Sequence, residues 1–155
     1  MNINTDAVVK KVNSLIQLDI DAIHLYKSAI DKLDTKAIKN QLTLFQSDHE
    51  NHVRRFSEAV QRLGGIPPEY KKDIMGHLLN SLTAIRSITG TEGALKAMQS
   101  NEKLTNKTYE TALTFEFPVD IMNIVRQNRE DERRHLEYIE NCLAQRTWES
   151  QEKAA

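Results

Sequence analysis

The chain has a single cysteine, Cys142, so it cannot form a disulfide bond within itself. One cysteine also suits a reducing compartment. Positive charge is not in excess either, because 21 Lys and Arg face 22 Asp and Glu and give a formal net charge of −1 at pH 7. Without a basic excess to neutralise phosphates, we expect no nucleic-acid partner.

Long apolar runs are missing as well. Residues 1–11 lack the apolar core of a signal peptide, and no segment approaches the roughly 18 uninterrupted apolar residues of a membrane span. We therefore expect a cytoplasmic protein with no membrane partner. The sequence also has no nucleophile–base pairing, no Gly-rich phosphate loop and no Cys-x-x-Cys pair. Metal chemistry is the only chemistry that its residues support.

Aromatic residues make up only 6% of the chain, whereas charged residues make up 28%. This composition suits long helices coated by solvent. No run of β-branched residues alternates with period two, so we expect no strands. The length of 155 residues suits one domain, 1–155.

Apolar residues recur with the 3/4 spacing of helices that face a common core. This spacing predicts helices at about 5–33, 35–63, 71–88, 92–114 and 118–146. Gly64 and Gly65, followed by Pro67 and Pro68, end the second of these helices. The connection 64–90 is long enough to cross the molecule and carries the short helix. We therefore predict an all-α fold, an antiparallel four-helix bundle with a long helical crossover.

A six-residue pattern occurs twice at a constant offset of 83 positions, as from 19 to 102 and from 52 to 135. The first copy consists of Asp19, Ala22, Tyr26, Asp48, His49 and His52. The second copy consists of Glu102, Thr105, Tyr109, Asp131, Glu132 and His135. Carboxylate matches carboxylate, Tyr matches Tyr and His matches His. The one mismatch in charge type is His49 against Glu132.

Six of these residues occupy core-facing positions and have side chains that bind metals. They are Asp19, His49, His52, Glu102, Glu132 and His135. A buried charge without a partner is costly, so these groups must be compensated, and a metal ion would compensate them at once. The i, i+3 spacing of His49–His52 and of Glu132–His135 puts each pair on one helix face. Two such pairs, with one carboxylate from each remaining helix, form the layout of a dinuclear metal site.

The segment from Glu132 to His135 resembles the Glu-x-x-His motif in the last helix of the ferritin-like superfamily, in particular of the bacterioferritin and rubrerythrin type. The segment from Asp19 to Tyr26 resembles its first-helix motif. The chain is most similar to small bacterial ferritin-like proteins, some of them stress-associated. The resemblance implies a ferritin-like domain that binds two irons, or manganese, and reacts with oxygen or peroxide. It implies the ligands Asp19, His52, Glu102, Glu132 and His135, with His49 in the place of a bridging Glu.

The chain departs from the family pattern at two positions. Asp19 stands where the family usually has Glu, which shortens its reach. His49 cannot bridge a close metal pair as a carboxylate does, because the two imidazole nitrogens point away from each other. The ligand charge also falls, from four carboxylates to three. A mixed set with three His suits Fe(II), Mn(II), Zn(II) or adventitious Ni(II).

Two functions remain open. The first is a metal-binding bundle with a degenerate di-metal site that handles iron or oxidative stress, with oxygen- or peroxide-reducing chemistry if it is an enzyme. In the second, the six residues form a polar network with no cofactor, and the bundle acts by association in a stress response, for example as a homodimer. In either case we expect the hydroxyls of Tyr26 and Tyr109 to form hydrogen bonds inside the core.

Overall fold

The computed structural model describes residues 3–70 and 89–149. These residues form the helices α1 (Thr5–Ile30), α2 (Lys36–Arg62), α4 (Gly90–Ala112) and α5 (Val119–Gln145). Within the described ranges there is no strand, as predicted. The expected crossover helix 71–88 lies outside the described residues.

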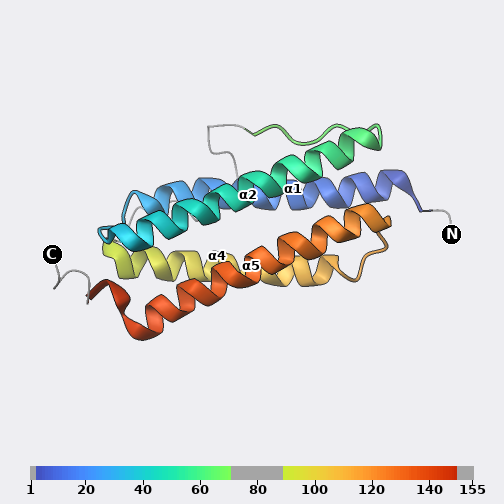
Figure 1. Ribbon diagram of the computed structural model, residues 1–155. Coiled ribbons are helices and arrows are strands. Elements are labelled where there is room, and N and C mark those ends of the chain that lie inside the picture. Colours follow the sequence, from blue (N-terminus) through green and yellow to red (C-terminus); the bar gives the residue numbers. More distant parts are fainter. Residues whose placement is uncertain (1–2, 71–88, 150–155) are drawn as a thin grey trace.

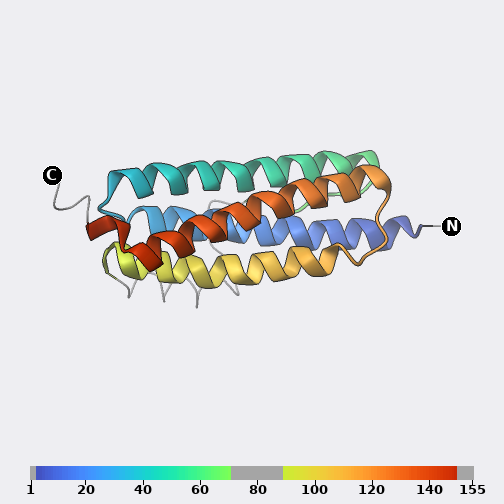
Figure 2. The same cartoon turned by 60° about the horizontal axis from the view of Figure 1, so that its bottom comes forward.

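The four helices pack as two hairpins, which we call the first hairpin (α1 and α2) and the second hairpin (α4 and α5). The closest packing is within each hairpin, and further contacts join α1 to α4 and α2 to α5. The two helices of each hairpin run in opposite directions (Figure 1 and Figure 2). Helix α2 ends and α4 begins at opposite ends of the molecule (Figure 1). All four helices therefore contribute to one helical bundle.

Helix α1 begins and ends for local reasons. Its first turn is capped by Asn4, whose Oδ1 accepts a hydrogen bond from the backbone N–H of Ala7 at 3.2 Å. It ends at Ile30 and not at the expected position 33. The backbone N–H groups of Lys32 and Leu33 bond to carbonyls three residues back, which tightens the last turn and terminates the α-helix.

The apolar core is divided by a polar layer. One apolar cluster includes Leu42, Leu95 and Ile139, and the other includes Phe56, Ala112 and Val125. On α2, α4 and α5 the predicted metal ligands come between the residues of these two clusters in sequence. Because each helix enters both clusters, the apolar packing fixes where along the bundle the four polar segments meet.

Gly65 is required where the chain leaves α2. A Cβ atom at this position would lie 2.7 Å from Cγ1 of Val9 and 3.0 Å from Cγ1 of Val60, too close for either short branched side chain to yield. We expect Gly65→Ala to lower the free energy of unfolding by about 1–3 kcal/mol through overpacking. Chemical denaturation measures the change. The exposed Gln61→Ala should stay within about 0.5 kcal/mol, and an equal effect of both changes would contradict this account.

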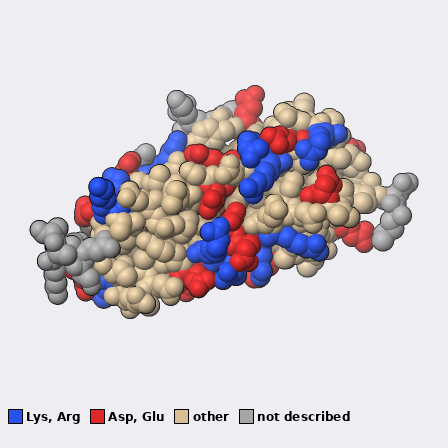
Figure 3. All heavy atoms as spheres, in the orientation of Figure 1, with Lys and Arg blue, Asp and Glu red and all other residues tan. Residues whose placement is uncertain are grey.

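The apolarity of the helices and the charge on the surface also follow from the structure. No helix among the described residues has both the length and the apolarity needed to cross a bilayer. On the face in Figure 3, Lys and Arg lie among Asp and Glu, so the two signs of charge are interspersed there.

Candidate metal centre

The structure brings all six predicted ligands together in the polar layer. Their exposed fraction is 0% in each case, and they come from all four helices. Their donor atoms form two sets, and within each set these atoms lie within 4.8 Å of one another. The first set is Asp19, His49, His52 and Glu132. The second set is His49, Glu102, Glu132 and His135. His49 and Glu132, the mismatched pair of the repeat, belong to both sets.

The first set is closely hydrogen-bonded around Asp19. Oδ1 of Asp19 lies 2.7 Å from Nδ1 of His49 and 3.1 Å from Nδ1 of His52. Its Oδ2 accepts a hydrogen bond from the hydroxyl of Tyr109 at 2.6 Å. Both carboxylate oxygens of Asp19 are therefore engaged.

The second set is more widely spaced. Oε1 of Glu102 lies 3.5 Å from Nε2 of His49 and 3.6 Å from Nδ1 of His135. Oε2 of Glu132 lies 3.5 Å from the same Nδ1 of His135. Glu102 also accepts a hydrogen bond from the hydroxyl of Tyr26. The expectation that both tyrosines bond inside the core is thus confirmed.

Asp48 and Asp131 belong to the site but were not among the predicted ligands. Asp131 lies 2.9 Å from Nε2 of His52, and Asp48 lies 2.9 Å from Nε2 of His135. Each aspartate therefore holds the histidine of the other hairpin. Carboxylates that orient a metal-binding imidazole in this way are typical of metal sites. The internal repeat was the available signal, because it contains both residues.

Several buried atoms of the cluster have no hydrogen-bond partner among residues 3–70 and 89–149. They are Nε2 of His49, Nδ1 of His135, Oε2 of Glu102 and both side-chain oxygens of Glu132. A buried polar atom without a partner costs about 1–3 kcal/mol. Imidazole nitrogens and carboxylate oxygens are also the donors that first-row divalent metals take. The cluster could therefore bind a metal ion.

The histidines are basic in this environment. Burial opposes protonation, but Glu132 and the hydrogen bond to Asp19 raise the pKa of His49 to about 9. Burial also lowers the pKa of His135, but the neighbouring Asp48, Glu102 and Glu132 raise it to about 11. Without a metal, the imidazoles are therefore protonated near neutral pH and compensate the carboxylates.

The carboxylates respond to these cations unequally. Burial opposes ionisation of Asp19, but His52 and His49 lower its pKa to about 2. The neighbouring His135 and His49 likewise overcome burial and hold the pKa of Glu102 well below its usual range. Burial raises the pKa of Glu132, although His49 opposes this effect. Glu132 is therefore the carboxylate with the weakest compensation.

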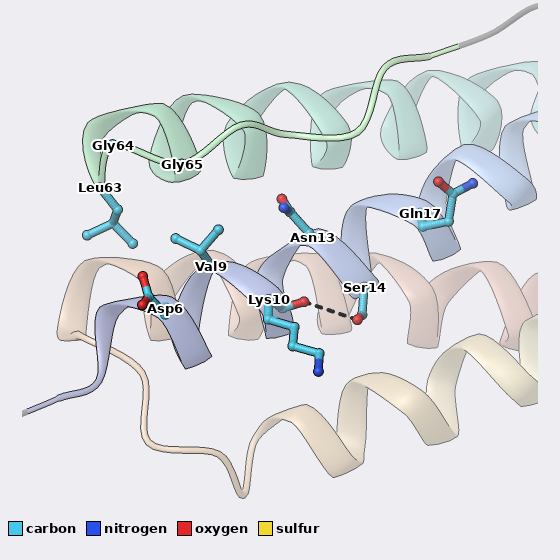
Figure 4. A pocket seen from close by; sticks show the side chains of 9 residues that line it. All are labelled: Asp6, Val9, Lys10, Asn13, Ser14, Gln17, Leu63, Gly64 and Gly65. Carbon is cyan, nitrogen blue, oxygen red and sulfur yellow. Dashed lines mark hydrogen bonds between the residues drawn. The ribbon is translucent and has the colours of Figure 1, made fainter.

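A surface groove of about 560 Å³ lies apart from this cluster. It is lined by the first turns of α1 and by the turn after α2, and none of the six predicted ligands lines it (Figure 4). The hydroxyl of Ser14 is bonded to the carbonyl of Lys10 in the same helix at 3.1 Å. The polar groups of the groove thus do not converge on a common point, and the buried cluster remains the candidate site.

Comparison with known proteins assigns the chain to a family. No curated protein matches the chain. A family model described as "Domain of unknown function (DUF2383)" matches residues 7–114, which include α1 from its third residue on and all of α2 and α4. The match covers more than half of the 155 residues. The chain therefore belongs to the DUF2383 family.

Proposed function

We propose that this chain is a ferritin-like metal-binding protein that handles iron or responds to oxidative stress. Its single domain would hold the metal between the two hairpins, with Asp19, His49, His52, Glu102, Glu132 and His135 as the ligand positions. The observation that carries the proposal is the group of buried donor atoms that lack hydrogen-bond partners, all on residues of the polar layer.

The surrounding residues support metal binding over accidental clustering. Asp48 and Asp131 hold Nε2 of the two repeated histidines, so that Nδ1 of each faces the interior of the cluster. Tyr26 and Tyr109 donate to the two repeated carboxylates. Both kinds of contact orient side chains that would otherwise rotate, which is what a metal site requires.

Iron is the metal that suits the proposed function, with manganese or zinc as the alternatives for this donor set. Iron held by these ligands would supply the electrons for the reduction of dioxygen or peroxide. The protein contributes a core that excludes bulk water, because every one of the six ligand positions is 0% exposed. The tyrosine hydroxyls hold the carboxylates in place.

Metal analysis tests the proposal. We expect the metal-free chain, loaded anaerobically with Fe(II) or Mn(II) and desalted, to retain about one or two ions per chain by elemental analysis. The double variant Glu132→Gln/His135→Gln should retain none, because it removes two ligand positions, whereas the exposed Arg133→Gln serves as a control. Failure of the native chain to retain any divalent metal would contradict the proposal.

A metal-free bundle that acts by association is the second candidate. This candidate is favoured because each histidine of the cluster has its own carboxylate oxygen within 2.9 Å. These oxygens belong to Asp19, Asp131 and Asp48. In that case the six residues compensate one another, and a homodimer or another protein partner would carry the function. Retention of no metal under any loading condition is its expected result.

A further inference from the structure

We infer that this chain holds a single divalent metal ion in the second set, His49, Glu102, Glu132 and His135, and that the first set supports this site through hydrogen bonds. The inference rests on the proposed metal-binding function and specifies its number of ions and its ligands. It differs from the paired site that the repeat would form if its two halves were alike.

His49 faces the second set with its free nitrogen. Its Nδ1 lies 2.7 Å from Oδ1 of Asp19. An ionised carboxylate can only accept a hydrogen bond, so Nδ1 of His49 carries the proton. The other nitrogen, Nε2, has no hydrogen-bond partner among the described residues and lies 3.5 Å from Glu102. When a metal displaces the proton on Nε2, Asp19 therefore directs the lone pair of His49 away from the first set and towards the second.

The two repeated histidines are not equally free to bind a metal. Nε2 of His135 bonds to Asp48, while its Nδ1 has no hydrogen-bond partner in the described part of the chain. His52 has both nitrogens engaged, with Nδ1 at 3.1 Å from Asp19 and Nε2 at 2.9 Å from Asp131. His135 thus offers a donor atom and His52 does not.

The spacing of the donor atoms separates the two sets in the same way. Around a tetrahedral metal with bonds of about 2.0–2.1 Å, neighbouring donor atoms lie about 3.3–3.4 Å apart. The measured separations in the second set are 3.5 Å, 3.6 Å and 3.5 Å. In the first set, Glu132 lies 3.3 Å from both His49 and His52, but Asp19 lies at hydrogen-bond distance from the same histidines, 2.7 Å and 3.1 Å. Asp19 would therefore have to move to admit an ion into the first set, whereas these three pairs of the second set already have the required spacing.

The surroundings of the two sets differ as well. Next to the second set, the centroid of the Phe45 ring lies 4.2 Å from the centroid of the His135 ring. It lies 5.5 Å from the centroid of the Tyr138 ring. At the positions equivalent by the repeat, Asn128 accepts a hydrogen bond from Arg55 and donates one to Tyr109, which in turn bonds to Asp19. The second set thus borders the Phe45 ring, and the first is tied into a hydrogen-bonded chain.

Cobalt(II) is the probe for this inference, because its visible absorption reports the coordination geometry. We expect the metal-free native chain to bind one Co(II) per chain with the intense bands of a tetrahedral site. The repeat supplies matched variants. His135→Gln should weaken binding by well over about 100-fold, whereas His52→Gln should weaken it by about 10-fold to 100-fold, as expected for an outer-layer residue.

Each alternative result has a distinct meaning. Two Co(II) ions per chain, equal losses in the two variants, or the weak bands of a six-coordinate ion would overturn the single-ion site and leave metal binding in place. No binding of Co(II), Fe(II) or Mn(II) by the native chain would overturn the proposed function as well. Circular dichroism checks the fold of both variants, and if either misfolds, the stoichiometry and absorption of the native chain still decide.

Discussion

A chain with Glu in place of His49 is expected to bind two divalent metal ions where the native chain binds one. The carboxylate of Glu directs both oxygens to the same side and can bridge two metals about 3.5–4 Å apart, which the opposed nitrogens of an imidazole cannot do. The change also releases Oδ1 of Asp19 from its 2.7 Å contact with His49. Oδ1 of Asp19 then keeps only its 3.1 Å contact with Nδ1 of His52, in which a metal ion can take the place of the proton.

The same substitution should make stability depend on metal. In the native chain, protonated His49 lies 2.7 Å from Asp19 and 3.3 Å from Glu132. Replacing this cation by a fourth carboxylate leaves buried negative charge without compensation, at a cost of about 3–5 kcal/mol. We expect thermal unfolding of metal-free His49→Glu to occur well below that of the native chain and to recover on loading with Mn(II).

The control for this prediction is His49→Gln, which removes the cation without adding a bridging carboxylate. Its metal content should not exceed one ion per chain by elemental analysis. A His49→Glu chain that still binds one ion, with a melting temperature unaffected by metal, would show that His49 does not separate the two sets.

Raising the pH above about 6.5 is expected to lower stability without metal and to leave it nearly constant with metal. In the metal-free chain the folded pKa of His49 is about 9, above the ordinary value of 6.5. Its stabilising contribution is therefore complete below about pH 6.5 and is lost as the pH rises through 9, a loss on the order of 3 kcal/mol. His135, with a pKa of about 11, extends the same trend to higher pH.

A bound metal removes this loss, because imidazoles bind metals only after losing a proton and the metal-loaded fold therefore has no proton on them to lose. Denaturant titrations between pH 6 and 9.5 of chelated and Zn(II)-loaded protein measure both curves. We expect them to diverge as the pH rises. Parallel curves would mean that the metal does not compete with protons on these histidines, and a flat chelated curve would mean that the imidazoles are not charged in the core.

The helical spacing of the sequence predicted that six metal-binding side chains face the core, and the structure confirms it for each of them, from Asp19 on α1 to His135 on α5. That signal works because burial follows the period of the helix. The spacing could not show that Asp48 reaches His135, because this contact depends on how far α2 and α5 are displaced along the bundle. Nor could it show that Asp19 acts as an acceptor for His49.

Contacts between the repeats also determine which hairpins can pair. Asp48, Asp131 and the two tyrosines of the repeat each contact the other hairpin, with Asp131 at 2.9 Å from His52 and Tyr109 at 2.6 Å from Asp19. A second copy of the first hairpin would bring two His49 side chains together, and two second hairpins would oppose Glu132 to Glu132. The pairing of unlike hairpins puts a cation against a carboxylate. This single mismatch in the repeat thus favours the pairing of two unlike hairpins over the pairing of two like ones.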